Sequence, residues 1–210
     1  MDTARLRRSS RSPRARARVP RCRLAIDARG FANLATQLPS PNCDDRPEGC
    51  DIALIVVHGI SLPPGEFGSD AILRLFTNRI DPAAHPYFAM IADLRVSAHF
   101  LVRRDGTLLQ FVACSKRAWH AGRSSWRGRE GCNDYSVGIE LEGTDTLPYA
   151  GVQYRMLARL IRALRRRYPA GAVVGHSDVA PGRKTDPGPA FEWERLGRLL
   201  APKRRGPRSG

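Results

Sequence analysis

The sequence predicts a single domain of the α/β (α+β) class, in which helices flank a mixed central β-sheet. Three observations lead to this prediction. Short apolar runs of strand length are interspersed with segments of helical periodicity, and one pair of runs is joined by an Asp-Gly turn typical of a hairpin. The chain has 210 residues, of which 42% are hydrophobic, so it can bury one sizeable core.

The strands are predicted from apolar runs bounded by turn residues. Residues 52–57 form a run of the length and branching expected for a buried strand, and residues 172–175 form a shorter one. Residues 96–102 and 107–112 flank the sequence Arg-Arg-Asp-Gly. An Asp-Gly pair between two apolar runs favours an antiparallel hairpin at this point.

Another segment, residues 135–143, alternates apolar and polar side chains. As a strand it presents aliphatic side chains on one face and two carboxylates, Glu140 and Glu142, on the other. Periodicity does not choose between the two glutamates. An ordinary edge strand with one solvated face is the alternative to a functional site here.

Three helices are predicted. Residues 71–77 place apolar side chains on one face, and residues 157–168 combine a leucine-rich stripe with arginines outside it, as in a helix with one buried and one solvated face. The last helix spans residues 191–200, with Pro189 just upstream as an initiation signal.

The residues 175–189 carry an imidazole, a lysine and a carboxylate on one proline-rich loop: His176, Lys184 and Asp186. Imidazole nitrogen and carboxylate oxygen suit Zn²⁺, and a hydrolytic zinc site has three protein ligands. The best third ligand is His58, which follows the strand predicted at residues 52–57. The alternatives are a structural, hydrogen-bonded histidine after a strand and a simple Gly/Pro turn cluster.

Read together, these motifs resemble the zinc-dependent N-acetylmuramoyl-L-alanine amidases, and within them the AmpD-type enzymes that cleave 1,6-anhydro-N-acetylmuramyl peptides. The resemblance covers residues 24–202, with the blocks in the family's order. The matching blocks are LIVVHGISLPPGEFG, HPYF, LRVSAHFLVRRDG, KRAWHAG, CNDYSVGIELEGTD and GHSDVAPGRKTDPGP.

The resemblance implies a family fold of the same architecture and a set of site residues. It implies that His58, His176 and Asp186 bind one Zn²⁺ per chain, and that Glu140 and Lys184 are the catalytic pair. The implied reaction is hydrolysis of the amide bond between (1,6-anhydro)-N-acetylmuramic acid and L-alanine in a muropeptide.

Other residues of the matching blocks receive further roles. Arg95 is expected to bind a substrate carboxylate and Trp119 to form an apolar wall. His120 is expected to line the pocket and contact substrate, and His99 to be structural or pocket-lining. His85 is expected to help fix a loop.

Two glycines depart from the AmpD-type pattern. Gly59 stands where those enzymes usually carry asparagine, and Gly131 where they tend to carry a basic residue. Both departures concern substrate fit. Residues 62–88, by contrast, are closer to the AmpD-type enzymes than to the phage and animal relatives.

The formal charge of +15 at first suggests a nucleic-acid partner. However, residues 1–23 contribute +8 and the tail 203–210 contributes +4, so the domain expected at 24–202 carries only +3. We expect both terminal segments to be disordered, because they have almost no large apolar side chains to bury. Binding of the arms to nucleic acid or anionic lipid is the alternative, as is a start codon assigned too far upstream.

A cytoplasmic location is expected. The basic N-terminus is not followed by an apolar signal region, and no apolar run approaches the roughly 20 residues that span a membrane. The five cysteines lack C-x-x-C spacing and are expected to be reduced thiols. The substrate would then be imported fragments in peptidoglycan recycling, with no membrane partner. The rival function is a non-catalytic peptidoglycan-binding module; the oligomeric state stays open.

Overall fold

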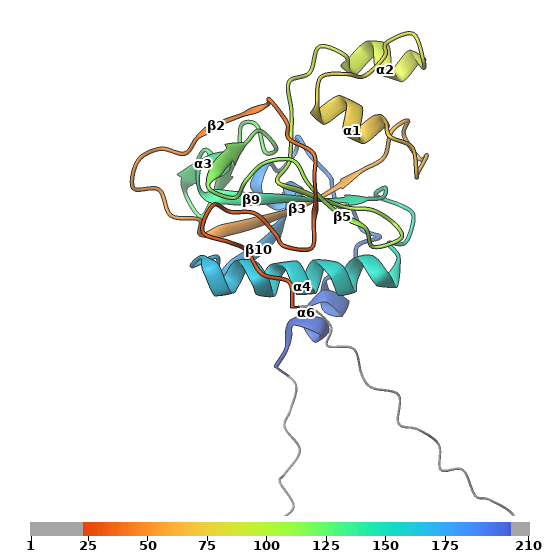
Figure 1. Cartoon of the computed structure of the whole chain (residues 1–210). Helices are drawn as coiled ribbons and strands as arrows, with labels where there is room; N and C mark the ends of the chain where they lie inside the picture. The colour runs from red at the N-terminus through yellow and green to blue at the C-terminus, as the bar shows by residue number, and fades with distance from the viewer. Residues whose placement is uncertain (1–22, 203–210) are drawn as a thin grey trace, which may run out of the picture.

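The computed structural model describes residues 23–202, whose centre is a six-stranded sheet with helices on both faces (Figure 1). The expected N-terminal arm (residues 1–23) and basic tail (residues 203–210) lie outside the described part, except for residue 23. The strand order is β1 (Thr36–Gln37), β5 (Leu108–Gln110), β4 (Phe100–Val102), β9 (Ser136–Glu142), β3 (Leu54–Ile60) and β10 (Ala172–Gly175).

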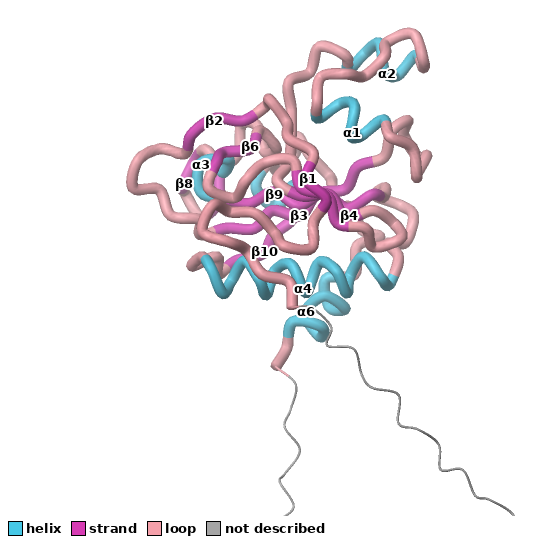
Figure 2. The backbone as a smooth tube through the Cα atoms, in the orientation of Figure 1, coloured by secondary structure: helices cyan, strands magenta, loops and turns pink. Residues whose placement is uncertain are grey.

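The sheet is mixed, as predicted. Strands β4, β9, β3 and β10 are parallel neighbours, and β1 is parallel to β5. The exception is the antiparallel pair β4–β5, which is the predicted hairpin. Figure 2 shows these strands, in magenta, stacked at the centre of the molecule.

One face of the sheet is covered by α4 (Gly151–Arg167), with α6 (Trp193–Leu200) packed beneath it (Figure 1). Both helices confirm the sequence prediction. The arginines predicted to lie outside the leucine stripe, Arg155, Arg159, Arg162 and Arg166, are exposed. The apolar layer between α4 and the sheet is built by Ile55, Val57, Val137, Ile139, Leu141, Leu157, Leu160, Ile161 and Leu164.

The opposite face carries the shorter helices. The predicted helix α1 (Ala71–Phe76) packs with α2 (Pro86–Ile91) over the β4–β5 part of the sheet. His85, which was expected to help fix a loop, caps α2, a helix that was not predicted; its Nδ1 accepts from the backbone N–H of Tyr87 at 3.0 Å. Helices α3 (Cys132–Tyr135) and α5 (His176–Val179) are single turns.

Two small antiparallel sheets complete the fold: β2 (Cys43–Asp45) with β6 (Lys116–Ala118), and β7 (Ser125–Trp126) with β8 (Arg129–Glu130). None was predicted, because runs of two or three residues show no periodicity. Within residues 23–202 all four cysteines are free thiols. No helix of that part is both long and apolar enough to cross a bilayer.

Strand β9 is central, which excludes the edge-strand alternative. All its residues are buried. Its aliphatic side chains belong to the α4 layer, so Glu140 and Glu142 lie on the opposite face. The parallel register pairs Glu140 with His58 of β3. The sheet therefore brings a carboxylate beside the first candidate ligand.

Candidate metal centre and active site

The three candidate ligands come from two parallel strands and one loop. His58 lies near the end of β3, and His176 directly follows β10. The register aligns Val57 with Gly175, so the next residue of each strand is a histidine at the same edge of the sheet. The loop carrying Asp186 returns to this edge, where the Ser177 N–H donates to the Asp186 carbonyl at 3.0 Å.

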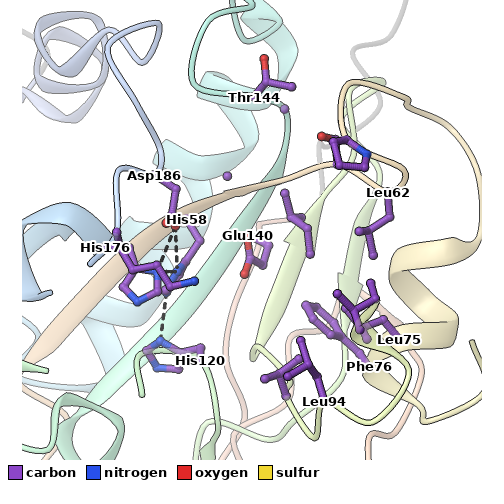
Figure 3. Close-up of a pocket in the computed structure, with 18 of the residues that line it drawn as sticks. His58, Leu62, Leu75, Phe76, Leu94, His120, Glu140, Thr144, His176 and Asp186 are labelled. Carbon is purple, nitrogen blue, oxygen red and sulfur yellow. Dashed lines mark hydrogen bonds and ion pairs between the residues drawn. The ribbon is translucent and has the colours of Figure 1, made fainter. Parts of the chain in front are cut away.

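One atom of each ligand points to a common centre (Figure 3). The two Nδ1 atoms of His58 and His176 are 3.0 Å apart, and the Asp186 Oδ2 lies 3.2 Å and 3.1 Å from them. Donors bound at about 2.0–2.1 Å to a tetrahedral ion lie about 3.3 Å from one another. Two imidazoles and one carboxylate also match the ligand types of a hydrolytic zinc site, so the residues fit Zn²⁺.

The electrostatics favour the protonation states that bind a metal. Burial lowers the pKa of His58 to about 4, although the adjacent Asp186 carboxylate opposes that shift. For Asp186 burial acts to raise the pKa, but its contacts with His176 and His58 outweigh burial and leave the pKa well below its usual value. At neutral pH His58 is uncharged and Asp186 is ionised.

Glu140 lies beside these ligands and is 8% exposed. Its Oε2 is buried and, among the described residues, has no hydrogen-bond partner. Burial, and then the negative charge of Asp186, raise its pKa well above the usual value, while Lys184 acts in the opposite direction. A buried oxygen without a partner beside a metal-binding cluster is available to a water or a substrate group.

Glu142, two residues along the same strand, has a different environment. Its carboxylate accepts hydrogen bonds from the backbone N–H groups of Gly68 at 2.6 Å and Arg104 at 3.1 Å, and it lies 3.8 Å from the Arg103 Nε. Both of its oxygens are thus engaged with loop residues. The structure therefore distinguishes the two glutamates, which periodicity did not.

A cavity of about 430 Å³ opens over the cluster. One wall contains the three candidate ligands with Glu140, and the exposed Lys184 also lines it. The other wall is apolar and comes from the segment that includes α1 and α2, as Figure 3 shows. Its labelled residues are Leu62, Leu75, Phe76 and Leu94.

The expected substrate residues are placed differently from one another. Trp119 lines the cavity, as an apolar wall requires. His120 also lines it, but its Nδ1 lies 3.0 Å from the His58 Nε2. Arg95 is exposed and donates to the backbone carbonyls of Ala92 and Leu94; it does not line the cavity. His99 is fully buried on the sheet.

The two unusual glycines lie in different places. Gly59 lines the cavity, and a Cβ there would overlap the hydroxyl of Tyr149, which donates to the Pro187 carbonyl at 2.9 Å. A side chain at position 59 therefore requires that ring to move. Gly131, by contrast, has φ of +69° and lines a separate cavity beside α3.

Three residues around the site received no role from the sequence: Asn133, Ser136 and Tyr149. Asn133 and Ser136 bond to residues 120 and 121, which contact the ligand histidines, and the Tyr149 hydroxyl donates to the carbonyl of Pro187, the residue after Asp186. Asn133 and Ser136 stand in the matching block CNDYSVGIELEGTD, which was the only signal available for them.

Comparison with known proteins agrees with this geometry. Residues 48–189 match the family model Amidase_2, described as N-acetylmuramoyl-L-alanine amidase. The 1,6-anhydro-N-acetylmuramyl-L-alanine amidase AmpD of Citrobacter freundii is 59% identical over 175 residues, which cover 82% of this chain and 94% of that protein.

Solved structures give the same result. A crystal structure of a selenomethionine AmpD derivative superposes with a TM-score of 0.82 at 57% identity, covering 84% of this chain and 99% of the other. The amidase AmiD from E. coli, in complex with anhydro-N-acetylmuramic acid-L-Ala-D-gamma-Glu-L-Lys, gives a TM-score of 0.52 at 28% identity, covering 83% and 65%. The chain therefore belongs to the N-acetylmuramoyl-L-alanine amidase family and, within it, is of the AmpD type.

Proposed function

We propose that the chain is a zinc-dependent amidase that cleaves the bond between the lactyl group of 1,6-anhydro-N-acetylmuramic acid and L-alanine in muropeptides. One observation carries the proposal: a buried, unpartnered carboxylate oxygen of Glu140 lies in the same cavity as three converging ligand atoms. This is the arrangement of a metal-assisted hydrolase with its general base.

The chemistry assigns separate tasks to the residues. His58, His176 and Asp186 would hold Zn²⁺, which would supply Lewis acidity and lower the pKa of a water to about 7. Glu140 takes a proton from the attacking water and later delivers it to the leaving alanine nitrogen. Its raised pKa suits this role, because the group must hold the proton between the two transfers.

The remaining residues stabilise charge and bind the substrate. Lys184 lines the cavity and stabilises the negative charge that develops on the lactyl carbonyl oxygen. Trp119 and the apolar wall bury the less polar parts of the muropeptide. Arg95 is assigned to a substrate carboxylate, for which its side chain must leave its present backbone partners. A contact from His120 to substrate stays part of the proposal.

The substrate class is proposed as anhydromuropeptides released during cell-wall turnover and recycled in the cytoplasm. Two similarities support it: the name of the Citrobacter freundii relative and the ligand of the AmiD complex. An enzyme in the cytoplasm meets turnover fragments rather than intact wall, and the sequence led us to expect that location.

The test is a comparison of two substrates with zinc-loaded protein. Anhydromuramyl peptides and intact sacculi are incubated at matched concentration of muramyl-alanine bonds, and the products are identified by mass. We expect cleavage at that bond, much faster for the anhydromuropeptides. Equal rates would remove the recycling assignment and leave the amidase, whereas no cleavage of either substrate would contradict both.

The rival functions have less support. A non-catalytic peptidoglycan-binding module does not require a complete ligand set, yet all three ligand positions and both catalytic positions are filled here. A zinc content near zero in carefully purified protein would favour it. Nucleic-acid binding would depend on the arginine-rich ends, and it predicts salt-sensitive DNA binding that disappears without residues 1–23.

A further inference from the structure

The outer nitrogens of the two candidate ligand histidines meet neighbouring residues of one short segment. The His58 Nε2 lies 3.0 Å from the His120 Nδ1, and the His176 Nε2 lies 3.3 Å from the Ala121 carbonyl oxygen. His58 and His176 come from different strands. Residues 120 and 121, from the segment that follows β6, therefore contact both of them on the side away from the metal position.

The hydrogen bonds around His120 determine which nitrogen carries each proton. The Ser136 hydroxyl donates to the Cys132 carbonyl at 2.5 Å, so it accepts from the His120 Nε2 at 3.1 Å. A neutral imidazole has one N–H, and in His120 that proton lies on Nε2. The His120 Nδ1 is then an acceptor, and it takes the proton of the His58 Nε2.

The second histidine is fixed more directly. A carbonyl oxygen only accepts, so the bond to Ala121 requires a proton on the His176 Nε2. Both candidate ligands therefore carry their proton on Nε2 and turn an unprotonated Nδ1 toward Asp186. An imidazole binds a metal through its unprotonated nitrogen, so this tautomer is the binding-competent one.

One side chain holds the segment that sets both tautomers. The Asn133 Oδ1 accepts the backbone N–H of His120 at 3.2 Å and that of Ala121 at 2.8 Å. Asn133 lies in α3, the same turn that supplies the Cys132 carbonyl. Its own carbonyl accepts from the Arg46 Nη1 at 3.1 Å, which anchors the turn.

We propose that Asn133 is a positioning residue for the metal centre. Through two backbone hydrogen bonds it places the His120 ring and the Ala121 carbonyl, and these present both ligand histidines with a free Nδ1. The inference rests on the proposed zinc site. It adds that metal affinity depends on an amide oxygen that does not touch the metal.

Two variants of Asn133 test this on the full-length protein. Asn133→Leu has similar volume but no acceptor, whereas Asn133→Asp keeps an acceptor oxygen. The control is Asn33→Leu, which removes an amide oxygen that accepts a backbone N–H, that of Ala25, outside the cavity. Zinc dissociation constants are measured by chelator competition on each variant.

We expect Asn133→Leu to weaken zinc binding by about 10- to 100-fold, the usual effect of losing a group that orients a metal-binding histidine. Asn133→Asp should stay within about threefold of the wild type, and Asn33→Leu should be unchanged. Wild-type affinity in folded Asn133→Leu would overturn the proposal. If the wild type itself bound no zinc, the proposed metal site would fail instead.

A second measurement needs neither zinc nor a folded Asn133→Leu. Histidine ¹⁵N NMR of the metal-free wild type reports the tautomer of each ring. We expect the Nε2–H form for both His58 and His176. If Asn133 only stabilised the fold, neither ring would have to adopt this tautomer. An Nδ1–H form at either ligand would overturn the proposal.

Discussion

The two faces of the central sheet differ in what their side chains do, although they share the same strands. On the α4 face, β9 contributes Val137, Ile139 and Leu141 to a close-packed apolar layer. On the other face the same strand contributes two buried glutamates and Gly138. Successive residues of β9 therefore alternate between the apolar layer under α4 and the face that carries the candidate site.

The chemical face also uses the lack of a side chain. A Cβ at Gly138 would overlap the ring of His120, so that ring lies directly against the backbone of β9. Close approach of this kind brings His120 within hydrogen-bond distance of both His58 and Ser136. Along β9, therefore, side-chain volume specifies one face and hydrogen-bond geometry specifies the other.

The largest expected effect separates metal binding from proton transfer on the chemical face. Asp186→Ala removes a ligand, so zinc and activity should both be lost. Glu140→Gln keeps the shape but removes the base, so zinc should remain while kcat falls by about 10² to 10⁴. Zinc content by mass spectrometry and turnover of anhydromuropeptide check both variants.

The control is Glu142→Gln, whose carboxylate holds Gly68 and Arg104 rather than facing the cluster. The kcat of Glu142→Gln should stay within about tenfold of the wild type, a smaller decrease than the loss of a general base causes. A loss equal to that of Glu140→Gln, or an empty metal site in Glu140→Gln, would show that the roles are wrongly assigned.

The next effect concerns the α4 face. Leu157 is fully buried in the apolar layer, so Leu157→Ala should lower the free energy of unfolding by about 2–5 kcal/mol. Zinc affinity of the folded protein should not change, because no ligand contacts this layer. Urea unfolding measures the free energy of unfolding, and chelator competition measures the zinc dissociation constant. A parallel loss of zinc affinity would mean that the two faces are not separable.

The smallest effect is a difference in pH dependence. Burial, and then the charge of Arg46, lower the pKa of His99 to about 3, whereas the unfolded value is about 6.5. The unfolded chain thus binds more protons between these values, so stability is lost as the pH falls from about 6.5 toward 3. This site contributes at most about 1.4 kcal/mol per pH unit.

His99→Asn tests the assignment. The amide oxygen takes the place of Nδ1, which accepts the Gly138 N–H at 3.0 Å, without a titrating group. In zinc-free protein, urea unfolding between pH 7 and pH 4 should show a shallower loss of stability for this variant than for the wild type. Leu157→Ala should retain the wild-type slope. Identical slopes for His99→Asn and wild type would contradict the assignment.

The elements predicted from sequence are those with strong local signals. The long helix α4, the strand β3 and the Asp-Gly hairpin have periodicity or turn chemistry that needs no partner. The two-residue strands β1, β7 and β8 form only by pairing and show no such pattern. The six-residue helix α2 was not predicted; His85, just before it, was expected only to help fix a loop.

The candidate ligands were accessible from sequence because strand ends place residues in register. His58, His176 and Asp186 converge as expected. The choice of Glu140 over Glu142 came from family resemblance, and only its contacts explain it physically. Asn133 and Ser136 could not be assigned, because their roles depend on hydrogen bonds between segments whose approach no local pattern encodes.

In β9, side chains alternate between the two faces of the sheet, and this alternation limits how the strand can change in length. An insertion of one residue within the strand would exchange the faces of the residues on one side of it, turning carboxylates into the α4 layer and aliphatic groups toward the candidate metal position. Point substitutions on the α4 face, by comparison, alter only packing. Among descendants of this sequence, variation in length should therefore accumulate in loops outside β9, while the strand keeps its frame.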